Sequence, residues 1–143
     1  MNEQPQETPP LPAHDRLLDA AEQLVASVGV SNLTLDAVAR EAGVSKGGLL
    51  YHFPSKFALI TAIVERLAAK CDSEHLQAIE NDGQGGNAFA RAYLAACTAQ
   101  LDPHKQHVKT ALLAAAGTDP RYLDPIRTQF AKWQTRLESD AGD

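Results

Sequence analysis

Apolar residues recur at three- and four-residue steps along most of the chain, a spacing that predicts helices and no strands. The first such stretch covers about residues 14–28. Its recurring apolar positions are Leu17, Leu18, Ala21, Leu24, Val25 and Val28. Gly29 follows this stripe, and glycine commonly ends a helix. The pattern therefore predicts an all-α fold that begins with an amphipathic helix.

Two short helices are predicted next. Thr34 can cap a helix over 35–42, because its side-chain oxygen can accept a free backbone N–H of the first turn. Gly43 can take the left-handed conformation that closes such a helix. Ser45 can cap a second short helix that ends near His52. Two short helices joined by a tight glycine turn predict a helix-turn-helix.

Longer helices are predicted for the rest of the chain. One begins at Lys56 and reaches about Ile79, and a glycine-rich loop over 81–86 follows it. Three further helices are predicted over 87–101, 105–116 and 120–138. The last of these has Ile126, Phe130, Trp133 and Leu137 on one apolar face.

These elements divide the chain into three parts. Residues 1–13 are polar and proline-rich, which predicts a disordered arm. Residues 14–56 form the predicted helix-turn-helix domain, and residues 57–143 form a helical C-terminal domain.

Charge is distributed unevenly along the chain. The net charge is −5, yet residues 31–70 hold five basic and three acidic residues. The basic ones are Arg40, Lys46, Lys56, Arg66 and Lys70. This asymmetry favours a small cationic module on an acidic body, although a simple scatter of charges would also fit.

Other kinds of chemistry find little support in the sequence. The two cysteines lack CxxC spacing, and no apolar run reaches the roughly 18 residues of a membrane helix. His104 and His107 lie three residues apart but have no third ligand nearby, so surface histidines are expected there. No catalytic Ser-His-Asp, Cys-His or paired-carboxylate pattern stands out. We therefore expect no metal, cofactor, membrane segment or enzymatic activity.

The second short helix is the unusual one, because Lys46-Gly47-Gly48 places two glycines near its start. Each glycine costs about 1 kcal/mol relative to alanine inside a helix. Close approach of the backbone to a DNA groove would account for this cost, as would a helix that is fully ordered only on DNA. A loose turn is the alternative interpretation. Lys46 could donate to guanine or to phosphate, and Tyr51 to a phosphate oxygen at the groove edge.

The segment LTLDAVAREAGVSKGGLLYHFPSK, together with the helix before it, resembles the DNA-binding domain of the TetR/AcrR family of bacterial transcriptional regulators over about residues 14–68. The resemblance is carried by the Gly-Val-Ser turn, the aromatic pair Tyr51 and Phe53, and Lys56 before a long apolar helix. Phe57 replaces the acidic residue that usually follows that lysine. Phe53 matches a packing position. The positions that match the family's DNA contacts are Thr34, Ser45, Lys46, Gly47, Tyr51, His52 and Lys56.

The resemblance implies a cytoplasmic, homodimeric repressor with a recognition helix at about 45–52. Its partners would be a double-stranded, inverted-repeat operator and a small hydrophobic effector that releases it. The C-terminal helices would bind that effector. The predicted contacts are Leu67, Phe89, Tyr93, Leu112, Phe130 and Trp133. From the residues alone, ordinary core packing explains these aromatic residues equally well.

Family members usually continue for two more helices, whereas this sequence stops at Asp143, just after its seventh predicted helix. The sequence therefore leaves open a truncated regulator that does not dimerise, or one that dimerises in another way. A helical module that binds protein through its hairpin is the third hypothesis. The salt dependence of DNA affinity separates the regulators from this module.

Overall fold

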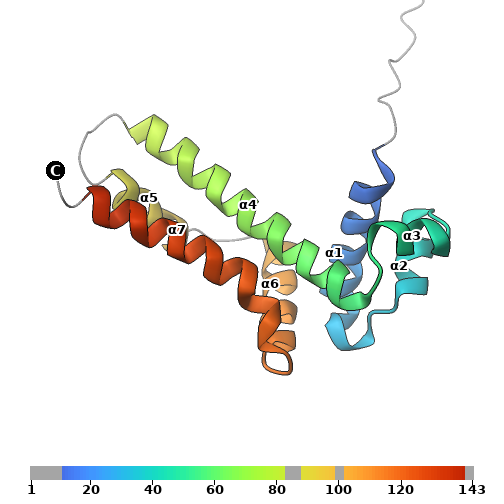
Figure 1. Ribbon diagram of the computed structural model, residues 1–143. Coiled ribbons are helices and arrows are strands. Elements are labelled where there is room, and N and C mark those ends of the chain that lie inside the picture. Colours follow the sequence, from blue (N-terminus) through green and yellow to red (C-terminus); the bar gives the residue numbers. More distant parts are fainter. Residues whose placement is uncertain (1–10, 83–87, 99–101, 141–143) are drawn as a thin grey trace, which may run out of the picture.

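The computed structural model describes residues 11–82, 88–98 and 102–140, and within these ranges the regular structure is entirely helical (Figure 1). The elements are α1 (Ala13–Asn32), α2 (Leu35–Ala42), α3 (Lys46–His52), α4 (Lys56–Asp82), α5 (Ala88–Thr98), α6 (Pro103–Ala116), the short 3-10 helix η1 (Pro120–Leu123) and α7 (Asp124–Asp140). The predicted all-α fold is confirmed. Figure 1 shows α4 running from the α1–α3 group to the far end of the molecule, with α7 alongside it.

The two short helices have the predicted boundaries because their ends are capped locally. The Thr34 side chain accepts a hydrogen bond from the Ala37 amide at 3.2 Å, and Ser45 accepts one from the Gly48 amide at 3.1 Å. Gly43 lies in the left-handed region, with φ 62° and ψ 37°. These three residues define the helix-turn-helix.

The predicted end of the first helix at Gly29 is wrong. Gly29 has φ 78° and ψ 166°, so the helix kinks there, but helical structure resumes and α1 ends at Asn32. Val30 is buried beyond the kink, and the Asn32 amide donates to the Val28 carbonyl at 3.0 Å. Burial of Val30 and this side-chain bond explain why the chain makes another turn before it leaves the helix.

Two predicted boundaries in the C-terminal part also shift. The region predicted as one helix over 120–138 begins as η1, where Asp119 accepts a hydrogen bond from the Arg121 amide, and α7 starts at Asp124. The helix predicted from Lys105 begins at Pro103, because proline is tolerated in a first turn.

Some predicted segments lie partly or wholly outside the described residues. They include residues 1–10 of the arm, 83–86 of the glycine-rich loop, and residues 87 and 99–101 of the helix predicted over 87–101. The helix α1 already begins at Ala13, one residue before the predicted domain boundary.

A single hydrophobic cluster joins the N-terminal helices to the C-terminal ones. It contains Leu17 and Val25 of α1, Leu49 of α3, Ile60 of α4 and Val108 of α6, all nearly inaccessible to solvent. Because α1 packs directly on α6, a rearrangement of the C-terminal helices can reach the helix-turn-helix through packed side chains.

Candidate functional site

The short helix α3 has one buried side and one open side. Leu49 is fully buried and Phe53, just after the helix, is 4% exposed, so both hold α3 against the core. Lys46 and Gly47 are exposed, and Tyr51 is 85% exposed. A largely exposed tyrosine on a small, well-anchored helix is available to contact a partner.

Thr34 and Ser45 lie at the starts of the two short helices, and each uses an oxygen lone pair to accept a backbone N–H. A hydroxyl group also has one O–H to donate. Both residues can therefore cap a helix and still donate to a phosphate oxygen.

The predicted lysines make intramolecular contacts in the free protein. Lys46 Nζ lies 2.9 Å from a carboxylate oxygen of Asp36, and both side chains are more than half exposed. Such exposed pairs contribute little to stability, so phosphate can replace the carboxylate at small cost. Lys56 Nζ donates to the Ser31 carbonyl at 3.3 Å, which ties the start of α4 to the end of α1.

His52 is half-buried and belongs to an aromatic cluster at the end of α3. Its ring centroid lies 5.2 Å from that of Tyr51 and 5.8 Å from that of His14 on α1. His14 also lies 5.1 Å from Phe53. The contacts position His52 and Tyr51 side by side at the edge of the open side of α3.

Sequence reasoning missed two residues beside this surface. Leu50 is an apolar residue that is 39% exposed on α3, where it could contact a thymine methyl group. Arg16 of α1 is half-buried, and its guanidinium lies near the Gly43 turn. The local sequence gave no signal for either position, because exposure of Leu50 and the approach of Arg16 depend on how α1, α2 and α3 pack.

A cavity of about 450 Å³, called here the apolar cavity, lies between α4, α6, η1 and α7. Its lining residues are Val64, Leu67, Ala68, Cys71, Glu74, His75, Tyr93, Lys109, Leu112, Leu113, Tyr122, Leu123, Ile126, Gln129, Phe130 and Trp133. Five of the predicted effector contacts are among them: Leu67, Tyr93, Leu112, Phe130 and Trp133. Phe89 is not, because it is 2% exposed and packs against His75 at 4.9 Å between ring centroids.

The polar edge of Trp133 is held away from the apolar cavity by Asp72 of α4. One carboxylate oxygen of Asp72 accepts the Trp133 indole N–H at 2.9 Å and the Gln129 amide at 2.8 Å. The indole ring also stacks on His75, with centroids 5.0 Å apart. These contacts fix α7 on α4 and leave a largely apolar wall.

His75 is the buried polar residue of this wall, and sequence reasoning treated it as an isolated histidine. It is 3% exposed, and its Nε2 has no hydrogen-bond partner among the described residues. Three aromatic rings surround it, from Phe89, Tyr93 and Trp133. The cavity therefore has one buried polar side chain in an aromatic setting.

Phe57, the residue that departs from the usual family pattern, connects the start of α4 to the apolar cavity. Its ring lies 5.1 Å from that of Tyr122, and the Arg121 guanidinium covers it at 4.6 Å. Burial raises the pKa of Tyr122, and the charge of Asp119 adds to this effect. Since Tyr122 lines the cavity, Phe57 links the cavity wall to the residues that follow α3.

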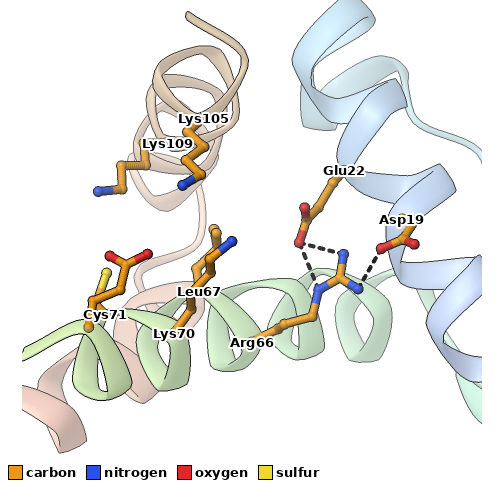
Figure 2. Close-up of a pocket in the computed structure, with 9 residues that line it drawn as sticks. Asp19, Glu22, Arg66, Leu67, Lys70, Cys71, Lys105 and Lys109 are labelled. Carbon is orange, nitrogen blue, oxygen red and sulfur yellow. Dashed lines mark hydrogen bonds and ion pairs between the residues drawn. The ribbon is translucent and has the colours of Figure 1, made fainter. Parts of the chain in front are cut away.

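A second hollow of about 290 Å³, lined mostly by charged residues and called here the lysine cleft, opens beside the apolar cavity. Its lining residues are Asp19, Glu22, Arg66, Leu67, Lys70, Cys71, Glu74, Lys105 and Lys109. Figure 2 shows Lys105 and Lys109 on α6 facing the segment of α4 that carries Lys70 and Cys71.

Arg66 points away from these lysines toward α1 (Figure 2). Its guanidinium donates to Glu22 at 2.9 Å and to Asp19 at 2.7 Å. Burial alone would lower the pKa of Arg66, but the hydrogen bonds and charges of Glu22 and Asp19 outweigh it and raise that pKa. The half-buried ion pairs join α4 to α1.

The side chains of the described residues form no group of three or more potential metal ligands. No helix in the described ranges combines the length and apolar character needed to cross a membrane.

Two family descriptions match this chain. Residues 17–63 match "Bacterial regulatory proteins, tetR family", and residues 87–143 match "Tetracyclin repressor-like, C-terminal domain". Together they cover more than half of the sequence. The first match contains the whole helix-turn-helix, and the second contains the helices α5 to α7.

Individual transcriptional regulators and solved structures are also similar to this chain. The HTH-type transcriptional regulator SrpR of Pseudomonas putida is 41% identical over 49 residues, which are 34% of this chain and 23% of SrpR. The chain thus spans about a quarter of that relative. GusR of Salmonella enterica shares the fold, with a TM-score of 0.73, 24% identity, and coverage of 94% of this chain and 69% of GusR.

A transcriptional regulator from Saccharomonospora viridis, solved in complex with choline, also has this fold. Its TM-score is 0.66 at 22% identity, over 90% of this chain and 67% of that one. The helix-turn-helix, the C-terminal helices and both family matches agree, and the chain therefore belongs to the tetR family of bacterial regulatory proteins.

Proposed function

We propose that this protein is a DNA-binding transcriptional regulator that inserts α3 into the major groove of an operator. The observation that carries the proposal is the open side of α3, where Lys46, Gly47 and Tyr51 are exposed on a helix fixed from behind by Leu49 and Phe53. A recognition helix must be packed firmly against the core and have one exposed face. Its N-terminal residues reach the base edges.

The residues around α3 fall into two groups by the contacts they can make. Lys46 and Leu50 lie on the helix itself, where they can contact guanine and a thymine methyl group. Thr34, Ser45 and Tyr51 carry hydroxyl groups suited to phosphate oxygens. Phosphate contacts would set the orientation of α3, and base contacts would set the sequence that it selects.

Lys56, His52 and Gly47 complete the proposed interface. Lys56 donates to the Ser31 carbonyl through one of its three N–H groups, so two remain for a phosphate. His52 is held beside Tyr51 by ring contact. Gly47 has no atom within 4 Å of the position that a Cβ would occupy, so its backbone can lie directly against the groove.

We further propose that the protein represses transcription as a homodimer on an inverted repeat and is released by a small molecule bound in the apolar cavity. The family resemblance suggests this cycle, and the size and lining of the cavity suit a small organic ligand. The related regulator solved with choline supports small-molecule binding in this family.

The helix α4 is the element that would transmit the ligand signal. It lines the cavity through Leu67 and Cys71, and it begins at Lys56, four residues after α3 ends. A ligand that binds more tightly to one position of α4 would therefore also change the position of α3.

The test of DNA binding is selection of the purified protein against random duplex DNA. An enriched inverted repeat is expected, and its affinity should fall steeply between about 50 and 200 mM salt because counterions are released from phosphates. Absence of any enriched sequence would overturn the proposal, and a single half-site would contradict the dimer.

Substitutions then locate the interface. Tyr51→Phe and Lys46→Ala should each weaken operator binding about five- to tenfold, and Lys46→Ala should alter the salt dependence, without unfolding the protein. Lys132→Ala is the matched control, because Lys132 is exposed on α7, outside the proposed interface. Affinity unchanged in both interface variants would contradict the placement of α3 in the groove.

A further inference from the structure

The apolar cavity and the lysine cleft adjoin each other. Four residues line both hollows: Leu67, Cys71, Glu74 and Lys109. A ligand held by these shared residues can contact both hollows. The site as a whole is amphipathic, with an aromatic half under α7 and a charged half between α4 and α6.

The aromatic half has few polar groups left to bind a ligand. The Trp133 indole N–H and the Gln129 amide both donate to Asp72. His75 offers one unpartnered ring nitrogen among the described residues, but it is buried among three aromatic rings. Apolar contact is therefore the main interaction that this half can provide.

The charged half has an excess of unpaired positive charge. Lys105 and Lys109 are half-buried one turn apart on α6, and the exposed Lys70 lies across from them on α4 (Figure 2). Lys105 approaches a carboxylate only at 3.9 Å, that of Asp102, and neither Lys70 nor Lys109 has an ion-pair partner among the described residues.

The acidic residues of the cleft do not cancel this excess. Asp19 and Glu22 are both engaged by the Arg66 guanidinium. Glu74 remains, but it is exposed to solvent. The cleft thus holds three lysines and one unengaged carboxylate. Lys109 is half-buried without a partner, which makes its surroundings favourable for a charge of opposite sign.

We propose that this composite site binds an amphipathic organic anion, with its apolar body in the apolar cavity and its acidic group between Lys70, Lys105 and Lys109. The proposal rests on the regulatory function above, because it specifies the chemical class of the effector. The anionic group would join α4 to α6, and the apolar body would contact α7.

Binding of three matched probes tests this class. The probes are 4-butylbenzoate, 4-butylbenzyl alcohol and 4-butylbenzylamine, which share a body and differ in the charge of one group. Trp133 is the single tryptophan of the chain and lines the cavity, so its fluorescence reports binding without DNA. We expect the benzoate to bind about tenfold more tightly than the alcohol, with the amine weakest.

Variants assign the effect to the lysines. Lys109→Met should weaken benzoate binding about five- to tenfold and leave the affinity for the alcohol unchanged, because methionine keeps much of the apolar stem. Lys132→Met on α7 removes an exposed lysine outside both hollows and should change neither affinity. Calorimetry on the same proteins checks the fluorescence values.

Several outcomes would overturn the ligand class. They are equal binding of the acid and the alcohol, tightest binding of the amine, no binding of the benzoate, and an equal loss of acid and alcohol affinity in Lys109→Met. Operator binding is measured separately on the same preparations. Retained operator binding with any of these outcomes would reject the ligand class alone, whereas loss of operator binding would reject the proposed function.

Discussion

Gly47 and Gly48 are neighbours in α3, but the space around them differs. A Cβ added at Gly47 would meet no atom within 4 Å, whereas one at Gly48 would lie 3.0 Å from a Val44 methyl carbon and 3.2 Å from the Ser45 hydroxyl oxygen. Gly48 therefore has a packing reason inside the free protein. The free protein gives no such reason for Gly47.

This difference separates a folding role from a DNA-binding role. Gly47→Ala should stabilise the free protein by about 0.5–1 kcal/mol, because alanine favours the helix. The same change should weaken operator binding about tenfold if the α3 backbone lies against the groove. Urea denaturation and fluorescence anisotropy with the selected operator measure the two effects.

Gly48→Ala serves as the matched comparison. It should give no gain in the free energy of unfolding, because the new methyl group would crowd Val44 and the capping Ser45. A Gly47→Ala protein that is more stable and still binds DNA normally would show that Gly47 is no contact position.

At the residue scale, the sequence predicted the roles of residues that act on their near neighbours in the chain. Thr34, Gly43 and Ser45 act on backbone within three or four residues, so their types and spacing were sufficient to predict their roles. Leu50 and His75 could not be predicted in this way. The exposure of Leu50 and the burial of His75 are set by helices distant in the sequence.

Among the described residues, two glycines have positive φ, and each controls how a helix ends or bends. Gly43 has φ 62° and ψ 37°, in the left-handed region that asparagine also tolerates. Gly29 has φ 78° and ψ 166°, in a region that is almost restricted to glycine. A Cβ added at Gly29 would meet no atom within 4 Å, and one at Gly43 would meet only the Arg16 guanidinium at 3.9 Å.

The backbone alone therefore predicts unequal effects of one substitution. Gly43→Asn should reduce the free energy of unfolding by less than about 1 kcal/mol, whereas Gly29→Asn should reduce it by about 1–3 kcal/mol. Chemical denaturation at matched protein concentration measures both. Equal losses would mean that the kink in α1 does not require the conformation at Gly29.

Element boundaries were predictable where a cap is encoded and were not where packing decides. The kink at Gly29 was mistaken for an end, because the sequence does not show that Val30 beyond it is buried. The 3-10 start of the last helical region was missed for a related reason. Asp119 caps Arg121 in η1, and the Arg121 guanidinium and Tyr122 ring then pack on Phe57, far away in the sequence.

At the scale of the whole molecule, the sequence predicted the components better than their connections. An all-α chain with a helix-turn-helix and apolar C-terminal helices followed from periodicity and caps. The common core of α1, α4 and α6 and the pairing of Arg66 with Glu22 did not, because both depend on long-range packing. These contacts connect the proposed ligand site with the proposed DNA surface.

If one protein binds both an operator and an anionic ligand, and the two sites are coupled through α4, each partner must change the affinity for the other by the same factor. We expect saturating 4-butylbenzoate to raise the operator Kd by about 5- to 100-fold, and saturating operator to raise the benzoate Kd equally. Anisotropy of labelled operator and fluorescence of Trp133 measure the two factors independently.

Phe57→Ala tests the route of this coupling, because it removes the ring that connects the start of α4 to the cavity-lining Tyr122. The factors by which benzoate and operator raise each other's Kd should both fall toward one. The benzoate Kd of the protein without DNA should stay close to its normal value, since Phe57 does not line the cavity. Phe130→Ala should instead lower the affinity for benzoate, because Phe130 lines the cavity from α7. A Phe57→Ala protein with both factors unchanged would show that the signal reaches α3 by another path, such as the Arg66 ion pairs with α1.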